Sequence, residues 1–318
     1  MKSRYLVTLT TGLLLCLISG LLAQTGDRLY PIAELTDEDL ARIDLHDSSV
    51  GDWLDVVGDA SITALDFSGG TSYDPADLDF RIWLAWHDGT DRIYVAMERA
   101  DDIYANPYIR GTGLIGRYFN VHDSSISIWV DGDGGRDPRD TPVSLGTVAE
   151  QILFYELSSR DSQYYIAIAE TFDEGSRVQL WNYEDPSIPF PFGEWYLRPP
   201  YAEGGGTHFG EQPTVSITEF YITPFDLFVW DDPALSRVSD LHPGKFINIQ
   251  LEISDHEGEL DPQGYYPGAG RFRLGQSRQD WQDALLLGPG GAIPEVEDTV
   301  VESITWGRIK ASFDEEVP

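Results

Sequence analysis

Alternation of apolar and polar residues with a period of two runs along most of this 318-residue chain, and it limits the folds that the chain can adopt. Side chains of a β-strand point alternately to opposite faces, so this period is typical of strands with one buried face. We therefore predict an all-β fold. The predicted strands cover residues 62–67, 80–86, 92–98, 125–130, 151–157, 164–169, 178–183, 215–222 and 246–253, with shorter strands near 284–287 and within 300–313.

Two segments depart from this period and predict short helices. Residues 36–43 begin with a threonine suited to an N-cap, and residues 224–238 begin with a proline suited to a first helical turn. Long loops rich in Gly and Pro are expected at 185–213 and 255–270. No internal repeat is present, which disfavours a propeller or a solenoid. The sequence predicts one antiparallel β-sandwich of jelly-roll or immunoglobulin-like type, with long loops and one or two short helices.

The N-terminal residues 1–23 have the three parts of a secretory signal. Lys2 and Arg4 give a positive start, an almost uncharged apolar stretch follows, and Ala23 offers a small residue for cleavage. A retained membrane anchor is the alternative, although the apolar stretch is short for a span of roughly 20 residues. We expect cleavage after Ala23 and a secreted protein, extracellular or periplasmic, from a bacterium.

The only cysteine, Cys16, lies inside this predicted signal peptide. The mature chain is therefore expected to contain no disulfide and no thiolate metal site. No Ser/Gly linker divides the remaining sequence. We predict that residues 24–318 form a single domain, with a core over about 40–290.

The charge of the chain argues against several partners. It has 54 acidic residues against 21 Lys and Arg, a formal net charge of −33. DNA, RNA and anionic membrane surfaces attract basic proteins. We expect no nucleic-acid partner and no membrane span after signal cleavage.

Several phrases, taken in order, resemble family 9 carbohydrate-binding modules and their bacterial relatives. The phrases are the opening strand at 43–53, the central hairpin at 83–102, the strand at 123–131, and the late strands at 220–224 and 244–255. The resemblance covers about 40–290 and implies a β-sandwich that binds sugars, often beside bound calcium. The chain departs from the family where Leu45, not Gly, follows Asp44, and where the loop at 185–213 is longer than a minimal module needs.

Aromatic rings that loops expose are candidates for binding sugars, because the flat apolar faces of sugars stack on them. The alternative for each ring is packing in the core, which we expect for Trp83 and Trp129. The candidate ligand-binding residues are Trp195, Tyr196, Tyr201, Trp86, Trp281 and Tyr265.

Three groups of aspartates are candidates for binding a hard cation such as calcium, which prefers six to eight oxygen ligands. Residues 131–137 alternate Asp and Gly, as a loop that folds around a cation would, and an ordinary polar turn is the alternative. The other two groups lie at predicted strand ends, where a solvated turn is the alternative. The candidate metal ligands are Asp131, Asp133, Asp137, Asp101, Asp102 and Asp255.

These observations predict a non-catalytic, calcium-associated protein that binds carbohydrate by aromatic stacking in a loop-lined groove. One alternative is a glycoside-active hydrolase, or another component of polysaccharide breakdown, which would need two carboxylates roughly 5–10 Å apart. A second is a haem electron carrier that uses Met97 with His242 or Lys245, although Met97 alternates with Val95 as a core residue does. A third is a surface or structural protein without a ligand.

Overall fold

The structure is a computed structural model that describes most of the central part of the chain. The residues that it describes are 29–69, 73–103, 125–134, 160, 162–172, 175–181, 194–210, 213–229, 231–255, 270–274 and 281–293. Asp137, Tyr265, the predicted signal peptide and the predicted strands at 151–157 and 300–313 lie outside this set. The predictions that concern them stay predictions.

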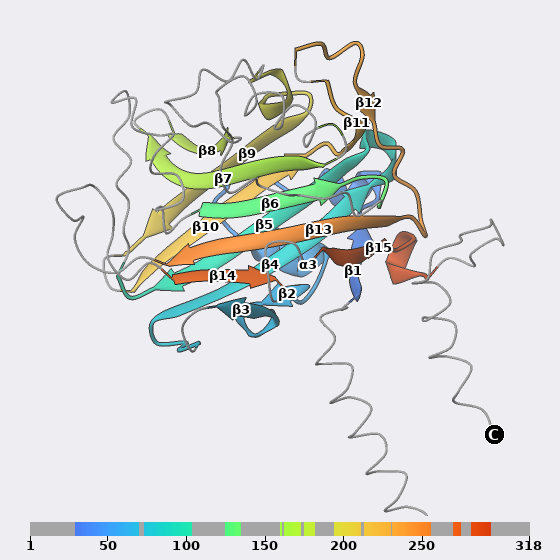
Figure 1. Ribbon diagram of the computed structural model, residues 1–318. Coiled ribbons are helices and arrows are strands. Elements are labelled where there is room, and N and C mark those ends of the chain that lie inside the picture. The colour runs from blue at the N-terminus through green and yellow to red at the C-terminus, as the bar shows by residue number, and fades with distance from the viewer. Residues whose placement is uncertain are drawn as a thin grey trace, which may run out of the picture.

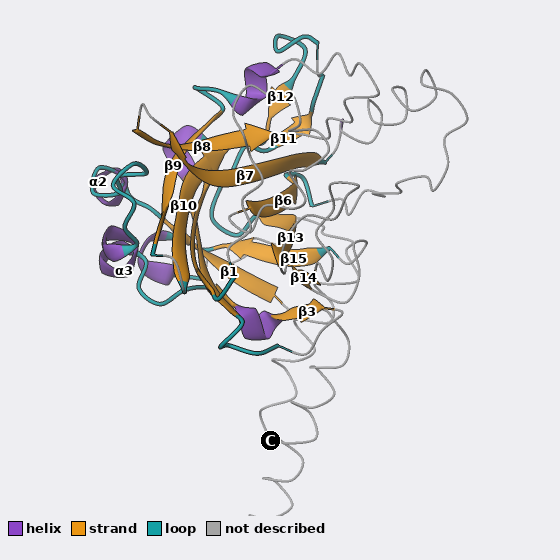
Figure 2. Cartoon of the chain, turned by 90° about the vertical axis from the view of Figure 1, so that its left-hand side faces the viewer, coloured by secondary structure: helices purple, strands orange, loops and turns teal. Residues whose placement is uncertain are grey.

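The described strands form two layers that face each other (Figures 1 and 2). The first layer consists of β2 (Ile62–Thr63), β4 (Leu78–His87), β5 (Arg92–Asp101), β10 (Thr214–Ile222) and β9 (Ala202–Phe209). The second layer consists of β15 (Gln282–Leu286), β13 (Phe246–Asp255), β6 (Ser125–Asp131), β7 (Gln163–Phe172) and β8 (Gly175–Trp181), with β14 (Gly270–Leu274) beside β13 and β3 (Phe67–Gly69) beside β14. The pairings within each layer are antiparallel. The predicted all-β antiparallel sandwich is confirmed.

One strand joins the two layers. The first four residues of β1 (Leu29–Glu34) pair in parallel with β15, and its last two residues pair in parallel with β4. The layers are therefore two parts of one curled sheet. This strand is not among those predicted from the sequence.

The main core fills the space between the layers, and it follows from the period of two. In β4, Ile82 and Leu84 face this core, while Trp83 faces the opposite side. In β13, Ile249 and Leu251 face the same core from the second layer. All five side chains are 0% exposed. Each buried aliphatic side chain stabilises the fold by about 1.5–3 kcal/mol relative to an exposed one.

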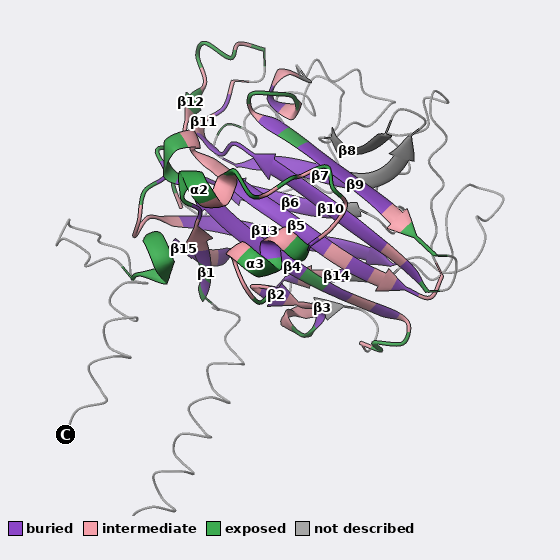
Figure 3. Ribbon diagram, turned by 180° about the vertical axis from the view of Figure 1, so that it is seen from behind, coloured by how far each residue is buried: buried purple, intermediate pink, exposed green. Residues whose placement is uncertain are grey.

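Two short helices cover the outer face of the first layer (Figures 2 and 3). They are α2 (Asp37–Leu40) and α3 (Gly51–Val56). Thr36 is the N-cap of α2, as the sequence predicted, and it also forms a capping box with Asp39. Trp53 of α3 is 0% exposed and packs in a second cluster with Trp83, so the helices bury apolar surface of their own. Among the described residues, no helix has the length and apolar character needed to cross a membrane.

The predicted helix at 224–238 is wrong. This segment contains two short antiparallel strands, β11 (Phe225–Leu227) and β12 (Arg237–Val238). The side-chain amide of Gln163 on β7 explains the extended start, because its Oε1 accepts from the N–H of Phe225 and its Nε2 donates to the carbonyl of Phe225. A helix would turn these backbone groups away from Gln163.

Two further strands were not predicted from the sequence. β9 lies within the predicted loop at 185–213, and β14 begins where the predicted loop at 255–270 ends. β9 includes Gly204 and Gly205, which are rare in strands because glycine has no side chain to pack. Here the absence of a side chain is required: a Cβ on Gly205 would collide with the carbonyl of Leu45. Trp53, expected on an opening strand, lies instead on α3.

Candidate functional site

The outer face of the second layer, which points away from the main core, carries aromatic and polar side chains. Strand alternation places Ile128 and Ile249 in the core and directs their sequence neighbours outward. The outward aromatic and aliphatic residues form a packed cluster of Trp129, Tyr164, Ile166 and Trp281. The face thus combines an aromatic cluster with polar residues on one side of a rigid sheet.

Four of these outward residues follow one another across neighbouring strands. Tyr164 of β7 pairs with Trp129 of β6, and Trp129 pairs with Gln250 of β13. Ile249 pairs with Gln282, so the antiparallel register places Trp281 beside Gln250. We call Tyr164, Trp129, Gln250 and Trp281 the aromatic–amide row.

The rings of the row are held in place by contacts with one another and with the sheet. The rings of Trp129 and Tyr164 are stacked, with centroids 4.1 Å apart and planes inclined by 27°. The hydroxyl groups of Tyr164 and Ser127 lie 3.1 Å apart in a hydrogen bond. Trp129, Tyr164 and Trp281 are 5%, 7% and 7% exposed.

Gln250 is the unusual member of the row. It is 1% exposed, and both polar atoms of its side-chain amide are buried without a hydrogen-bond partner. A buried polar group without a partner costs about 1–3 kcal/mol. Such groups are rare in folded proteins, and a ligand that supplies the missing donor and acceptor is one reason for their presence.

Two polar pairs border the row on the same face. The side-chain amide of Asn248 donates to Oδ1 of Asp283 at 2.7 Å, and Nε of Arg273 donates to Oε2 of Glu252 at 2.7 Å. These groups therefore already have partners within the protein. Among the described polar side chains of the face, Gln250 is the amide that keeps its hydrogen-bonding capacity.

The aromatic residues predicted to bind a ligand lie in different surroundings. Trp86 and Tyr196 are 0% and 1% exposed and belong to the main core. The indole N–H of Trp86 is used internally, since it donates to the carbonyl of Leu287. Trp195 and Tyr201 are half-buried and pack edge to face with each other against the core. Their predicted role in binding therefore stays untested.

Trp281 is the one predicted ligand-binding residue in the described part of the chain that lies in the row. Trp129 was predicted to pack in the core, and Tyr164 and Gln250 were not among the predicted site residues. One feature of the sequence did point to Gln250. It is a polar residue at an outward position of a strand whose alternate residues are aliphatic. That signal did not distinguish Gln250 from other outward polar residues.

The predicted cation ligands Asp101 and Asp255 meet at one corner, where Arg99 lies between them. Asp101 accepts hydrogen bonds from Nε and Nη2 of Arg99, and Oδ1 of Asp255 lies 3.7 Å from Nη2. Arg99 is 0% exposed and also donates to the carbonyl of Ser254. The guanidinium already supplies positive charge to both carboxylates, so the corner is organised as a buried ion network. Asp102, the neighbour of Asp101, is partly buried.

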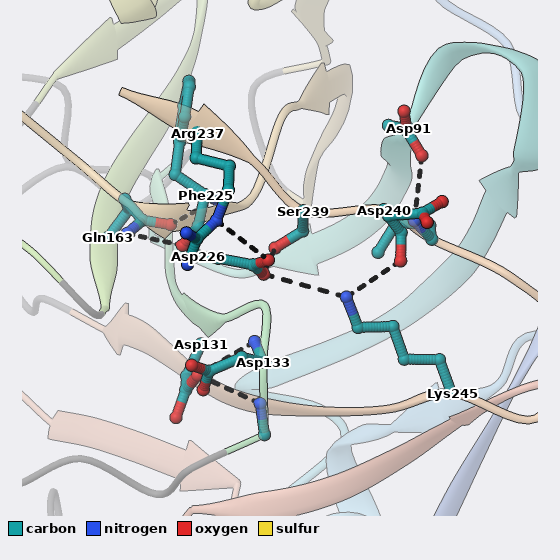
Figure 4. Close-up of polar contacts among 12 residues, drawn as sticks. Asp91, Asp131, Asp133, Gln163, Phe225, Asp226, Arg237, Ser239, Asp240 and Lys245 are labelled. Carbon is teal, nitrogen blue, oxygen red and sulfur yellow. Dashed lines mark hydrogen bonds and ion pairs between the residues drawn. The ribbon is translucent and has the colours of Figure 1, made fainter. Parts of the chain in front are cut away.

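The described part of the predicted cation loop, residues 131–134, forms a turn after β6 (Figure 4). Oδ1 of Asp131 accepts from the backbone N–H groups of Asp133 and Gly134, which is the backbone habit of an aspartate turn. Asp131 is 0% exposed, whereas Asp133 is exposed. The structure tests neither the binding of a cation here nor the part that Asp137 would have in it.

The residues of the haem alternative lie in contrasting environments. Met97 is 0% exposed in the main core. Nζ of Lys245 donates to the carbonyl of Asp240 and lies 3.8 Å from Oδ1 of Asp226 (Figure 4). His242 is exposed. Haem binding stays untested.

Comparison with known proteins gives limited similarity. No protein-family model and no curated protein matches the sequence. Two solved structures of a family 9 carbohydrate-binding module from Caldicellulosiruptor kristjanssonii are similar to this chain at 10% identity. The complex with glucose has a TM-score of 0.45 and covers 86% of this chain and 100% of that chain. The complex with cellotriose has a TM-score of 0.46, and the match covers 87% of this chain and 99% of that chain. The module is of the family that the sequence phrases resemble.

Proposed function

We propose that the protein binds carbohydrate on the outer face of the second layer, and that the aromatic–amide row holds the sugar. The observation that carries the proposal is the side-chain amide of Gln250, buried without a hydrogen-bond partner between positions occupied by tryptophan. A sugar hydroxyl both donates and accepts hydrogen bonds. It therefore complements an amide that offers one acceptor and two donor hydrogens.

The tryptophan rings on either side of Gln250 suit the apolar faces of a sugar. A pyranose with equatorial hydroxyls presents flat C–H faces, which pack against aromatic rings. Strands in a sheet lie about 4.8 Å apart, so the backbone positions of Trp129 and Trp281 are about 10 Å apart. A sugar over Gln250 would have a tryptophan on each side.

Binding at this face requires a conformational opening, because the members of the row are at most 7% exposed. A protein that must open before it binds associates more slowly than the usual 10⁵–10⁷ M⁻¹s⁻¹, in order-of-magnitude terms. Binding itself would be non-catalytic. Secretion of the protein is a part of this proposal that the signal-like residues 1–23 support.

A glycan-panel assay with purified protein tests the proposal, with Gln250→Leu as the decisive variant. Leucine has a similar volume and no polar atom, so it removes the unsatisfied amide and should leave the fold at least as stable. We expect saturable binding of particular glycans by the wild type and at least a tenfold weaker affinity for Gln250→Leu. Trp129→Ala and Trp281→Ala should also lose binding.

Phe209→Ala is the matched control, because Phe209 is an aromatic residue of β9 in the other layer and is 50% exposed. It should bind as the wild type does. Equal affinity of the wild type and Gln250→Leu would contradict the assigned site. The absence of binding to every glycan of a panel that covers plant, fungal and bacterial polysaccharides would contradict the function.

A further inference from the structure

A cluster of three carboxylates lies on the other side of the molecule, at the outer face of the first layer. Asp47, Asp52 and Glu219 each offer one carboxylate oxygen, and these oxygens lie within 4.8 Å of one another. Asp47 precedes α3, Asp52 is in its first turn, and Glu219 is in the middle of β10. The cluster therefore joins the segment that contains α3 to the sheet beneath it.

Small neighbours make room for Glu219 in the sheet. It pairs with Ala96 on β5 and with Gly205 on β9, so no large side chain flanks it on either strand. The indole N–H of Trp53 donates to its Oε1 at 2.9 Å. This hydrogen bond holds the carboxyl group in one orientation under the start of α3.

The two aspartates are held by backbone groups of their own segment. Oδ2 of Asp52 accepts from the N–H of Asp44 at 2.8 Å, and Oδ1 of Asp47 accepts from the N–H of Ser49 at 2.8 Å. Asp47 is exposed and Asp52 is partly buried. The cluster is thus open to water on the side of Asp47.

The second oxygen of Glu219 is the observation that points to a ligand. Glu219 is 0% exposed, and its Oε2 is buried without a hydrogen-bond partner. The pKa of Glu219 is raised from 4.5 to about 8, chiefly by burial and in smaller part by the nearby charges of Asp52 and Asp47. Burial and the charge of Asp52 also raise the pKa of Asp47. A cation bound here would attract all three groups and favour the ionised form of Glu219, which the burial and the neighbouring aspartates disfavour.

We propose that Asp47, Asp52 and Glu219 bind one calcium ion. Calcium takes oxygen ligands at about 2.3–2.6 Å, so two of its ligands lie up to roughly 5 Å apart, which agrees with the spacing of the three oxygens. The cluster contains no sulfur or imidazole ligand, which favours a hard cation over a transition metal. Water would complete the coordination on the exposed side of Asp47.

Such an ion would connect the segment of α3 to β10 and stabilise the folded state. It lies at the opposite face from the aromatic–amide row, so this inference does not rest on the proposed function. It also differs from the predicted sites at Asp131 and Asp133 and at the Arg99 corner, because it shares no residue with either.

Calcium titration of the purified protein tests the inference. Isothermal calorimetry and thermal unfolding are measured in chelator and in added CaCl₂, for the wild type and for Glu219→Gln. Bound calcium should raise Tm of the wild type by roughly 5 °C at saturation. Glu219→Gln keeps the shape of the side chain and should lose that rise and bind calcium at least tenfold more weakly.

Asp47→Asn provides a second variant on an exposed loop. Asparagine keeps the Oδ1 that accepts from the N–H of Ser49 and removes the charge, so it should weaken calcium binding as well. Asp59→Asn is the matched control, because it removes the same charge from an exposed residue outside the cluster. It should retain the full rise in Tm. No calcium-dependent rise in the wild type, or an equal rise in the wild type and Glu219→Gln, would overturn the inference.

Terbium luminescence locates the ion independently. Trp53 contacts Glu219 directly, so excitation of its indole should sensitise Tb³⁺ bound at the cluster. Trp53→Phe should reduce the sensitised emission while Tb³⁺ still competes with calcium. Emission that Glu219→Gln and Trp53→Phe both leave unchanged would place the ion elsewhere and contradict the assignment.

Discussion

The indole N–H of Trp53 donates a 2.9 Å hydrogen bond to Oε1 of Glu219, across 166 residues of sequence. Both side chains are 0% exposed. This bond fixes α3 on the outer face of the first layer, since Trp53 is the buried residue of that helix and Glu219 lies in the middle of β10. Oε2 of the same carboxyl group is buried without a hydrogen-bond partner, and one oxygen of Glu219 lies within 4.8 Å of carboxylate oxygens of Asp47 and Asp52.

Trp53→Phe should destabilise the protein by about 1–3 kcal/mol. Phenylalanine keeps most of the packing but cannot donate to Glu219, so a buried carboxyl group loses its partner. Urea unfolding followed by circular dichroism measures the change. Leu54→Ala, the neighbouring position at 44% exposure, should cost less than 1 kcal/mol. If the two variants have the same stability, the hydrogen bond contributes little.

In chelator, stability should fall between about pH 5 and pH 8 because of Glu219. Its pKa is raised from 4.5 to about 8 by burial, with added effects of Asp52 and Asp47. Below about pH 4.5 both the folded and the unfolded states are protonated at this group. Above that pH the unfolded state loses the proton while the folded state keeps it, so the free energy of unfolding decreases until the pH reaches about 8.

Glu219→Gln should remove this pH dependence. One pKa unit corresponds to about 1.4 kcal/mol, so the variant should gain a few kcal/mol over the wild type near pH 8 and little near pH 5. Urea unfolding at a series of pH values measures the difference. A stability difference between the two proteins that stays constant from pH 5 to pH 8 would show that Glu219 ionises as in the unfolded chain.

Arg99→Met should destabilise the protein by about 3–5 kcal/mol. The substitution leaves Asp101 and Asp255 buried without the guanidinium that lies between them. Arg81→Met is the matched control, because Arg81 pairs with Glu98 at a site where the arginine side chain is 48% exposed. Surface ion pairs contribute about 0–1 kcal/mol, so the control should be nearly neutral. Equal effects in thermal unfolding would contradict the importance of burial here.

Gly205→Ala should destabilise the fold through a steric clash. A Cβ at this position would overlap the carbonyl oxygen of Leu45, and backbone cannot move aside as a flexible side chain can. We expect a loss of about 1–3 kcal/mol or more in chemical unfolding. In Gly288→Ala the nearest atom, the carbonyl oxygen of Ala292, is 3.4 Å from the new Cβ, so this variant should be close to the wild type.

The sequence by itself determined the class of the fold and most of its strands. Period-two alternation depends only on the opposite directions of successive side chains, so β4, β5, β6, β7, β10, β13 and β15 were all predicted close to their observed positions. The helical turn that Thr36 caps was predicted for a similar reason, because an N-cap binds backbone groups that are its neighbours in sequence. Such local interactions leave a local pattern.

The tertiary structure alone decided what depends on distant contacts. Gly205 belongs to a strand because β10 lies beside it, and residue 225 is extended because Gln163 binds its backbone. The same holds for the sites. Gln250 stands out because nothing pairs with its amide, and Glu219 because Asp47 and Asp52 reach it from the other end of the chain. In a chain with 54 acidic residues, only folding selects which carboxylates meet and which are removed from water.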